Sequence, residues 1–228
     1  MMSIEGRIRK NGGSQEYGQC RQIAENMCAE LGVVQDQFIV HHNLVASTLK
    51  SRLERDGRRR EKKLKLGSMS GLNEHVTVLS GRMYSDELSE DGMIEAVLTM
   101  NGFIEMDLLV GEELDYSFLT DAQDNKISVR IVGVVNNADD QDSYWVETPD
   151  SFESELLISP AVFEKYFLNG GKRYEFNTHW YVSFDPDSVD YLNAEHIVNT
   201  TDDYVGKNSS YGKIEEPVYL GLMKNFLA

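Results

Sequence analysis

The chain has 228 residues, of which 41% are hydrophobic and 26% charged, so it can bury a core in one large domain or two small ones. Its formal net charge of −16 at pH 7 disfavours binding to nucleic acid or to an anionic membrane surface. The apolar runs fall short of the roughly 20 residues of a membrane-spanning helix, and the first residues lack the apolar stretch of a signal peptide. We therefore expect a soluble protein or a soluble part of a larger one.

The first quarter of the chain predicts a helix, a strand and a second helix. Residues 1–18 are polar and glycine-rich, and we expect them to be disordered. Residues 19–32 carry apolar side chains at helical spacing and end in a glycine. A strand is predicted around 38–42. Apolar residues at i, i+4 and i+8 then predict a short helix over 44–53.

The two cysteines of the chain, Cys20 and Cys28, both fall on the first predicted helix. Eight residues of helix separate their Cα atoms by roughly 12 Å, which is too far for a disulfide. We interpret both as small buried hydrophobic residues.

Residues 50–65 form a basic run in an otherwise acidic chain. Nine basic and three acidic side chains give this run a net charge of +6, which leaves −22 for the rest. Such a run is typical of a solvated loop or helix face, with a nucleic-acid or phospholipid contact as the alternative. It contains no aromatic residue on which a base could stack.

The middle of the chain, 75–148, predicts short strands. Runs rich in β-branched residues occur at 76–79, 94–99, 114–118 and 127–135, and polar turns separate them. We interpret this part as an inserted β-rich lobe.

The last third returns to alternating strands and helices. A strand at 156–158 leads to Ser159-Pro160, a helix start that ends at Gly170-Gly171. A strand at 180–184 follows, and Asp187 is a candidate cap for a helix to about residue 196. The predicted class is α+β. An α/β lobe of residues 19–74 and 149–200 is interrupted by the lobe at 75–148, and 201–228 form a linker or tail.

Motifs for catalysis or cofactor binding are not evident. Gly170-Gly171-Lys172 is no phosphate loop, because Arg173 stands where serine or threonine is required. His41 and His42 are adjacent in a strand and should point to opposite faces. The isolated histidines are interpreted as packed or surface residues; these are His75, His179 and His196.

An acidic loop is the one candidate for a cation. Asp139, Asp140 and Asp142 offer oxygen ligands, but the loop lacks the glycine and final glutamate of an EF-hand. We interpret it as a solvated loop. We expect no catalytic residue, cofactor or metal, and therefore a binding or mechanical module.

Short motifs occur in a fixed order between about residues 75 and 170. Their residues are Gly81, Arg82, Val110, Gly111, Val132, Gly133, Tyr144 and Trp145. In this order the motifs resemble the extracytoplasmic domain of ABC transporter permeases of the MacB/FtsX type. Read physically, they are structural: Gly111 suits a turn before a strand, and Gly133 suits a bulge or a close backbone approach.

This resemblance implies an α/β lobe interrupted by a β-rich lobe, on the extracytoplasmic side of a bacterial cell membrane. It implies as partners the transmembrane helices of the permease and a separate ATPase subunit or domain, with peptide, lipid or protein cargo and no nucleic acid. The domain would relay ATP-driven motion and catalyse nothing. Two alternatives stay open: a stand-alone protein-interaction module, and a metal-dependent hydrolase that uses the acidic loop or His179.

Overall fold

The computed structural model describes residues 1–9, 13–139, 141–146, 149–190, 192–215, 221 and 224. It combines helices and strands, which confirms the predicted α+β class. The chain forms two compact units. Unit 1 contains Met1–Val40 and Asn177–Ala228, and unit 2 contains His41–Phe176.

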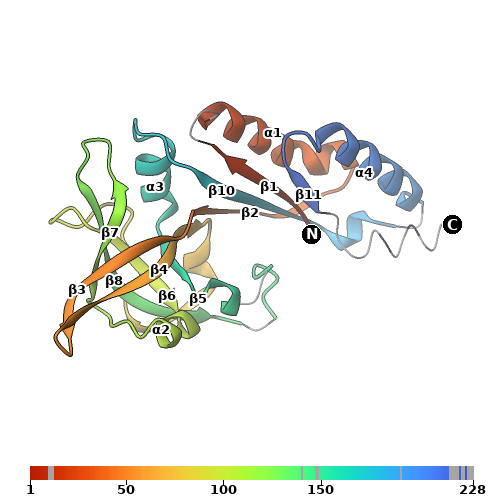
Figure 1. Ribbon diagram of the computed structural model, residues 1–228. Helices are drawn as coiled ribbons and strands as arrows, with labels where there is room; N and C mark the ends of the chain where they lie inside the picture. The colour runs from red at the N-terminus through yellow and green to blue at the C-terminus, as the bar shows by residue number, and fades with distance from the viewer. Residues whose placement is uncertain are drawn as a thin grey trace. The chain divides into compact units, whose positions relative to one another are not determined.

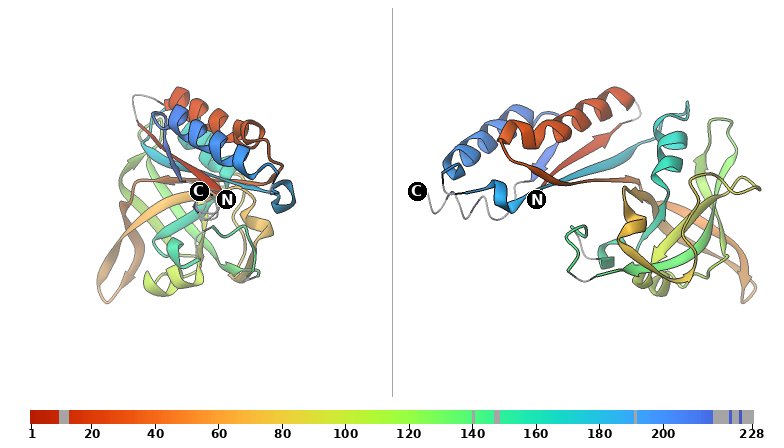
Figure 2. Two further views of the ribbon diagram at one scale, coloured as in Figure 1. Left: turned by 90° about the vertical axis from the view of Figure 1, so that its right-hand side faces the viewer. Right: turned by 180° about the vertical axis from the view of Figure 1, so that it is seen from behind.

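Unit 1 is a sheet covered on one face by two helices. Figures 1 and 2 show the helices side by side over the strands. The strand order is β11-β1-β10-β2. The elements are β1 (Met2–Ile8), α1 (Gly13–Leu31), β2 (Gln35–Leu44), β10 (Phe176–Phe184), a 3-10 turn at Pro186–Ser188, α4 (Ala194–Asn208) and β11 (Lys213–Glu215).

Aromatic side chains hold the layers of unit 1 together. Trp180 on β10 is completely buried, and its ring lies 5.5 Å from that of Tyr17 on α1. The Tyr204 hydroxyl on α4 donates a hydrogen bond to the Ile23 carbonyl on α1 at 2.6 Å. Both cysteines of α1 are buried and free, as the sequence predicts.

Unit 2 contains a closed ring of six strands in the order β4-β3-β7-β8-β6-β9, with β9 pairing back onto β4. The β6–β8 and β4–β9 pairs are parallel, and the other pairs of the ring are antiparallel. The strands are β3 (Ser47–Arg55), β4 (Arg58–Met69), β6 (Ile94–Thr99), β7 (Glu113–Thr120), β8 (Lys126–Asn137) and β9 (Glu155–Ile158). A closed ring leaves no free edge within it.

The other elements of unit 2 connect or extend this ring. Strand β5 (Val76–Gly81) pairs with β8 outside the ring. The helices are α2 (Met100–Glu105) and α3 (Pro160–Phe163), the latter continuing as a π-helical turn, Glu164–Leu168; 3-10 turns lie at Leu72–Glu74 and Pro149–Phe152. Ser159 caps α3 as predicted, because its hydroxyl accepts a hydrogen bond from the Ala161 N–H at 3.1 Å.

The helix predicted over 44–53 is wrong, because this segment starts a long β-hairpin. Offsets of four and eight residues are even numbers, so they also place side chains on one face of a strand. Asp56 and Gly57 form the turn with φ of 55° and 73°, as the Asp-Gly hairpin signal requires. The basic run therefore lies on β3 and β4, not in a loop or on a helix.

The ends of the chain are more ordered than the sequence suggests. The stretch expected to be disordered, 1–18, contains β1, whose Met2, Ile4 and Ile8 alternate into the core. The tail expected from residue 201 is wrong up to Asn208, because α4 continues to that point and buries Thr201 and Tyr204. Both segments contain many polar residues, so the sequence did not indicate β1 or the second half of α4.

Two further boundaries also differ from the prediction. Asp185, not Asp187, caps the segment after β10, and it caps only a 3-10 turn. Unit 2 spans 41–176, whereas the inserted lobe was predicted at 75–148. It is larger because the ring includes β3, β4 and β9. No helix in the described part of the chain is long and apolar enough to cross a membrane.

Residues 41–176 expressed alone should fold cooperatively, because all six strands of the ring lie within that segment. Residues 75–148 should not fold, because they keep only two neighbouring pairs of the ring, β7–β8 and β8–β6. Near-ultraviolet circular dichroism and urea unfolding would distinguish the two fragments. A cooperative transition in the shorter fragment would contradict the ring as the folding unit.

Candidate functional site

Five of the motif residues come together at the middle of β8: Gly81, Arg82, Gly111, Val132 and Gly133. Strand β6 follows one edge of β8 from Val129 to Val135. Along the opposite edge, β7 pairs with β8 up to Arg130, and β5 pairs with it from Gly133 onward. Strand β8 therefore changes its partner between Arg130 and Gly133.

Backbone groups of two motifs complete the hydrogen bonding across this change of partner. The Gly111 N–H donates to the Ile131 carbonyl at 2.7 Å, and the Ile131 N–H donates to the Glu112 carbonyl at 2.9 Å. The Arg82 N–H donates to the Val132 carbonyl at 2.9 Å. Two loops thus replace the missing ladder bonds, as buried backbone groups require.

Glycine is needed where these segments cross. A Cβ atom on Gly133 would lie 2.2 Å from the Arg82 carbonyl oxygen, and one on Gly81 would lie 2.1 Å from the Val132 carbonyl oxygen. The register with β6 shifts here as well, which makes Val132 a bulge. Gly111 has φ of 89° in open space, so its backbone conformation and not crowding favours glycine.

Gly81→Ala should destabilise the protein by about 1–3 kcal/mol more than Gly92→Ala. Both glycines lie in unit 2 with φ between 73° and 79°, but no atom approaches the Cβ position of Gly92. The difference therefore isolates the clash from the left-handed backbone, which costs about 1–2 kcal/mol at either position. Equal losses in urea unfolding would contradict the close approach.

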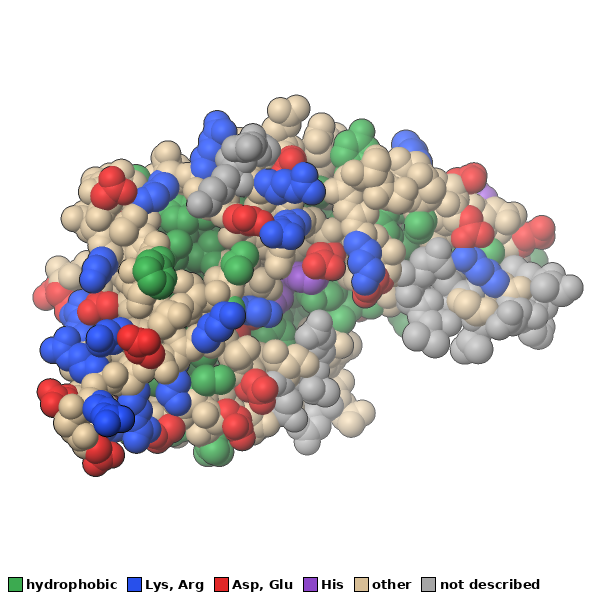
Figure 3. Space-filling view, in the orientation of Figure 1, with side chains coloured by type: hydrophobic (Ala, Val, Ile, Leu, Met, Phe, Trp, Pro, Cys, Tyr) green, Lys and Arg blue, Asp and Glu red, His purple; other side chains and the backbone are tan. Residues whose placement is uncertain are grey.

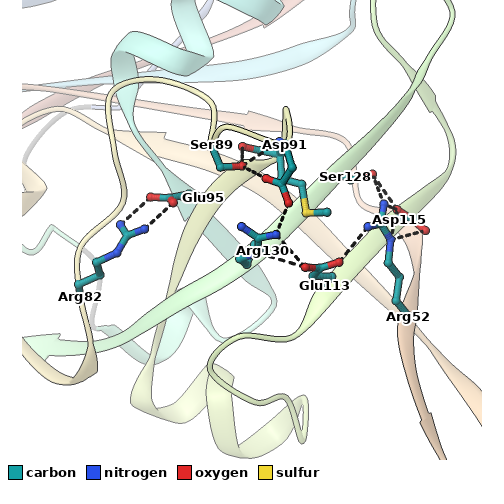
Figure 4. Close-up of polar contacts among 10 residues, drawn as sticks. Arg52, Arg82, Ser89, Asp91, Glu95, Glu113, Asp115, Ser128 and Arg130 are labelled. Atoms are coloured by element: carbon teal, nitrogen blue, oxygen red, sulfur yellow. Dashed lines mark hydrogen bonds and ion pairs between the residues drawn. The ribbon is translucent and has the colours of Figure 1, made fainter.

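Arg82 also places its side chain on a buried carboxylate (Figure 4). Its guanidinium donates to both oxygens of Glu95 on β6, at 2.6 and 2.5 Å. Glu95 is only 6% exposed and accepts a third bond from the Ser85 N–H. The Arg82 hydrogen bonds are the largest influence that lowers the pKa of Glu95. The motif arginine thus makes this buried charge tolerable.

A second group of charges crosses β8, β7 and β3 (Figure 4). Arg130 on β8 pairs with Asp91 and, at 2.8 Å, with Glu113 on β7. Arg52 on β3 pairs with Glu113 at 2.9 Å and with Asp115 at 2.7 Å. Carboxylates and guanidiniums therefore alternate along the surface of three neighbouring strands.

Hydrogen bonds to the arginines are the main cause of the lowered pKa values of Glu113 and Asp115. For Asp91 the hydroxyl of Ser89 comes first and Arg130 second. Lowered pKa values keep these carboxylates ionised at neutral pH, so they are poorly suited to act as general acids. These ion pairs link β8, β7 and β3 on the surface of the barrel.

Sequence reasoning identified Arg82 but missed its partner and the alternating group. Arg52 was noticed only as part of the basic run. One sign of this group was present in the sequence. If β7 and β8 are interpreted as a hairpin, Glu113 lies opposite Arg130, which predicts an ion pair across the two strands.

Arg82→Met should destabilise the protein at pH 7 by about 1–3 kcal/mol, less than a fully buried pair because Arg82 is 59% exposed. A lowered pKa contributes stability above the ordinary value, here 4.5, and this contribution is lost as the pH falls through the folded-state pKa. The difference between wild type and variant should therefore shrink below about pH 4.5. Urea unfolding at pH 7 and pH 4 measures it.

Arg58→Met is the matched control, because Arg58 is exposed beside the hairpin turn. It should change stability by less than about 0.5 kcal/mol at either pH. A loss for Arg82→Met that does not vary with pH would contradict the role of Glu95.

Glu112, directly after the motif residue Gly111, links the loop before β7 to β3. It is 7% exposed and pairs with Arg55 at 3.0 Å. The Ser51 hydroxyl donates to the other carboxylate oxygen of Glu112 at 2.6 Å, and the Leu109 N–H donates to the oxygen that Arg55 contacts, at 2.9 Å. Part of the basic run is thus engaged within the fold.

Tyr144 and Trp145 fasten the acidic loop to the start of β5. The ring of Tyr144 stacks on His75 at 3.8 Å, and its hydroxyl donates to the Ser70 carbonyl at 2.9 Å. The Trp145 indole N–H donates to the His75 carbonyl at 3.3 Å. Asp142 pairs with His75 Nδ1 at 2.7 Å. These contacts give the pair a structural role.

Among the described residues, the other candidate ligands have separate partners. Asp139 accepts a bond from the Gln141 N–H, and His179 stacks against Tyr181. Asp140 lies outside the described residues. Within the described ranges, no three histidine, cysteine or acidic side chains are grouped so that they could hold a metal ion.

The adjacent histidines of β2 contact different partners. His42 stacks on Phe163 at 4.9 Å, whereas His41 Nε2 lies 2.6 Å from Glu155 Oε1 in the interior of unit 2. A Cβ atom on Gly67 would lie 1.6 Å from that carboxylate, so glycine makes the space for it. No motif or spacing in the sequence indicated this buried pair.

Comparison with known proteins gives structural similarities only. No protein-family profile matches the chain, and no curated protein matches it. The periplasmic region of MacB from Actinobacillus actinomycetemcomitans matches with a TM-score of 0.44 and 14% identity, covering 99% of this chain and 92% of that one. The extracellular domain of the noncanonic ABC-type transporter YknZ from Gram-positive bacteria matches with 0.43 and 10%, covering 94% and 98%.

A domain of a protein described as a permease, from Porphyromonas gingivalis, matches with a TM-score of 0.40 and 14% identity, covering 89% of this chain and 83% of that one. The chain is thus similar to periplasmic or extracellular domains of transporters and permeases, the class that its motif order resembles.

Proposed function

We propose that this chain is the extracytoplasmic domain of an ABC transporter permease. In this role it contacts cargo or a partner protein and passes on motion driven by ATP hydrolysis in a separate subunit or domain. It has no catalytic role of its own. Its partners are the membrane helices of the permease and that ATPase.

The pairing of β1 with β11 supports this proposal. Strand β1 runs antiparallel to β11, with Ser3 opposite Glu215 and Glu5 opposite Lys213. This pairing holds two segments that are far apart in the sequence side by side, which suits a domain inserted between two consecutive membrane helices. The ionised, arginine-bound carboxylates of the barrel suit a binding module better than an enzyme.

The proposal is tested by locating the protein in cells of its native host. Phe118→Cys introduces a thiol at a position that is 86% exposed, whereas the native cysteines are buried. The protein should sediment with membranes, and a membrane-impermeant maleimide should label the new thiol in intact cells. Leu64→Cys, at a fully buried position, is the control that should stay unlabelled.

Two results would count against the proposal. Labelling of the Phe118→Cys variant only after lysis would place the domain on the cytoplasmic side. Recovery of the whole protein in the soluble fraction would favour the stand-alone interaction module instead.

A further inference from the structure

A pocket of about 270 Å³ lies in unit 2, and Ser128, which hydrogen-bonds Asp115, is one of its lining residues. Three segments form it: the β7–β8 hairpin, the stretch from Leu88 to Ile94, and the end of the π-helical turn with the chain that follows it. The face drawn in Figure 3 shows apolar side chains in a hollow between this hairpin and α3.

The walls of the pocket are apolar and well fixed. Phe167, Ile94 and Ile127 are each less than 10% exposed. The Tyr174 hydroxyl donates to the Thr120 carbonyl at 2.9 Å, so its ring is held in place. Burial raises the pKa of Tyr174 to about 12, so this wall is uncharged at neutral pH. An apolar group that enters would meet rigid aliphatic and aromatic surface.

The charges at the rim favour an anion. Lys126 and Lys165 line the pocket with exposed side chains. Lys165 lies over the ring of Tyr166 at 5.4 Å, and Lys126 contributes, after Arg52, to the lowered pKa of Asp115. Neither lysine forms an ion pair with a carboxylate in the described part of the chain.

The carboxylate at the rim is already engaged. Asp121 accepts bonds from the N–H groups of Gln123 and Asn125, at 2.9 and 2.8 Å, and from the Asn125 side chain. The Asp121 carboxylate is thus already hydrogen-bonded by donors of its own loop. The two ammonium groups are left to act on a ligand.

The volume limits the ligand to a small molecule. About 270 Å³ equals roughly nine water molecules at about 30 Å³ each. We propose that this pocket binds a small carboxylate of about ten non-hydrogen atoms, with its apolar body against the aromatic wall and its anionic end between Lys126 and Lys165. This site does not depend on whether the chain belongs to a transporter.

The test uses the full chain and octanoate, with octylammonium as the probe of equal shape and opposite charge. The backbone N–H groups of Gly92 and Gly170, which line the pocket, report binding in ¹H–¹⁵N spectra. Octanoate should shift both signals saturably, with a dissociation constant on the order of 1 mM or tighter. Octylammonium should bind at least about fivefold more weakly.

A pair of double variants separates the rim lysines from general charge. Lys126→Gln/Lys165→Gln should weaken octanoate binding at least about fivefold. Lys62→Gln/Lys63→Gln removes the same charge from the basic hairpin, outside the pocket, and should change binding less than about twofold.

Three outcomes would overturn the inference. The two glycine signals stay unmoved by octanoate, octylammonium binds as tightly, or both double variants weaken binding equally. The comparison of the two probes needs no variant, so the proposal stays testable even if a substitution disturbs folding.

Discussion

The change of partner along β8 is the constraint on which the barrel depends. One twelve-residue strand must pair with β6 throughout its centre, with β7 on its first half and with β5 on its second. On the edge of β8 opposite β6, backbone groups would be unpaired where β7 ends and β5 begins. The loops that contain Arg82 and Gly111 supply their hydrogen-bond partners. Because these loops must approach backbone to backbone, Gly81 and Gly133 have no room for a side chain. The two motif glycines are therefore a geometric requirement.

The charges of unit 2 follow from the same arrangement. Arg82 lies beside β8 because its N–H caps the Val132 carbonyl, and from there its guanidinium reaches Glu95. Glu112 lies there because its carbonyl accepts from Ile131, and its side chain then holds Arg55 of the hairpin. A strongly acidic domain thus uses part of its basic run for internal neutralisation. The run is consequently not a wholly free surface for an anionic partner.

The sequence predicts local elements better than their pairing. Ser159-Pro160 defined the start of α3, because capping chemistry is local. Val45, Leu49 and Leu53 misled, because their spacing fits a strand face as well as a helix, and only the Asp56-Gly57 turn decides between the two. The inner unit was drawn too small because β3, β4 and β9 belong to it only through long-range pairing. The order of the motifs could be recognised in the sequence. That Gly81, Gly111 and Gly133 come together on β8 could not, because it depends on long-range strand pairing.

Strand β8 also connects the pocket with the alternating arginines and carboxylates of the barrel. Its first residues, Lys126 and Ile127, line the pocket, and Ser128 beside them donates a hydrogen bond to Asp115 at 2.7 Å. Asp115 in turn belongs to the alternating charges that include Arg130, where the pairing of β8 with β7 ends. Packed strands transmit small displacements because their interiors are dense. A group bound beside Lys126 would therefore contact the same strand whose register the motif glycines and Arg82 hold.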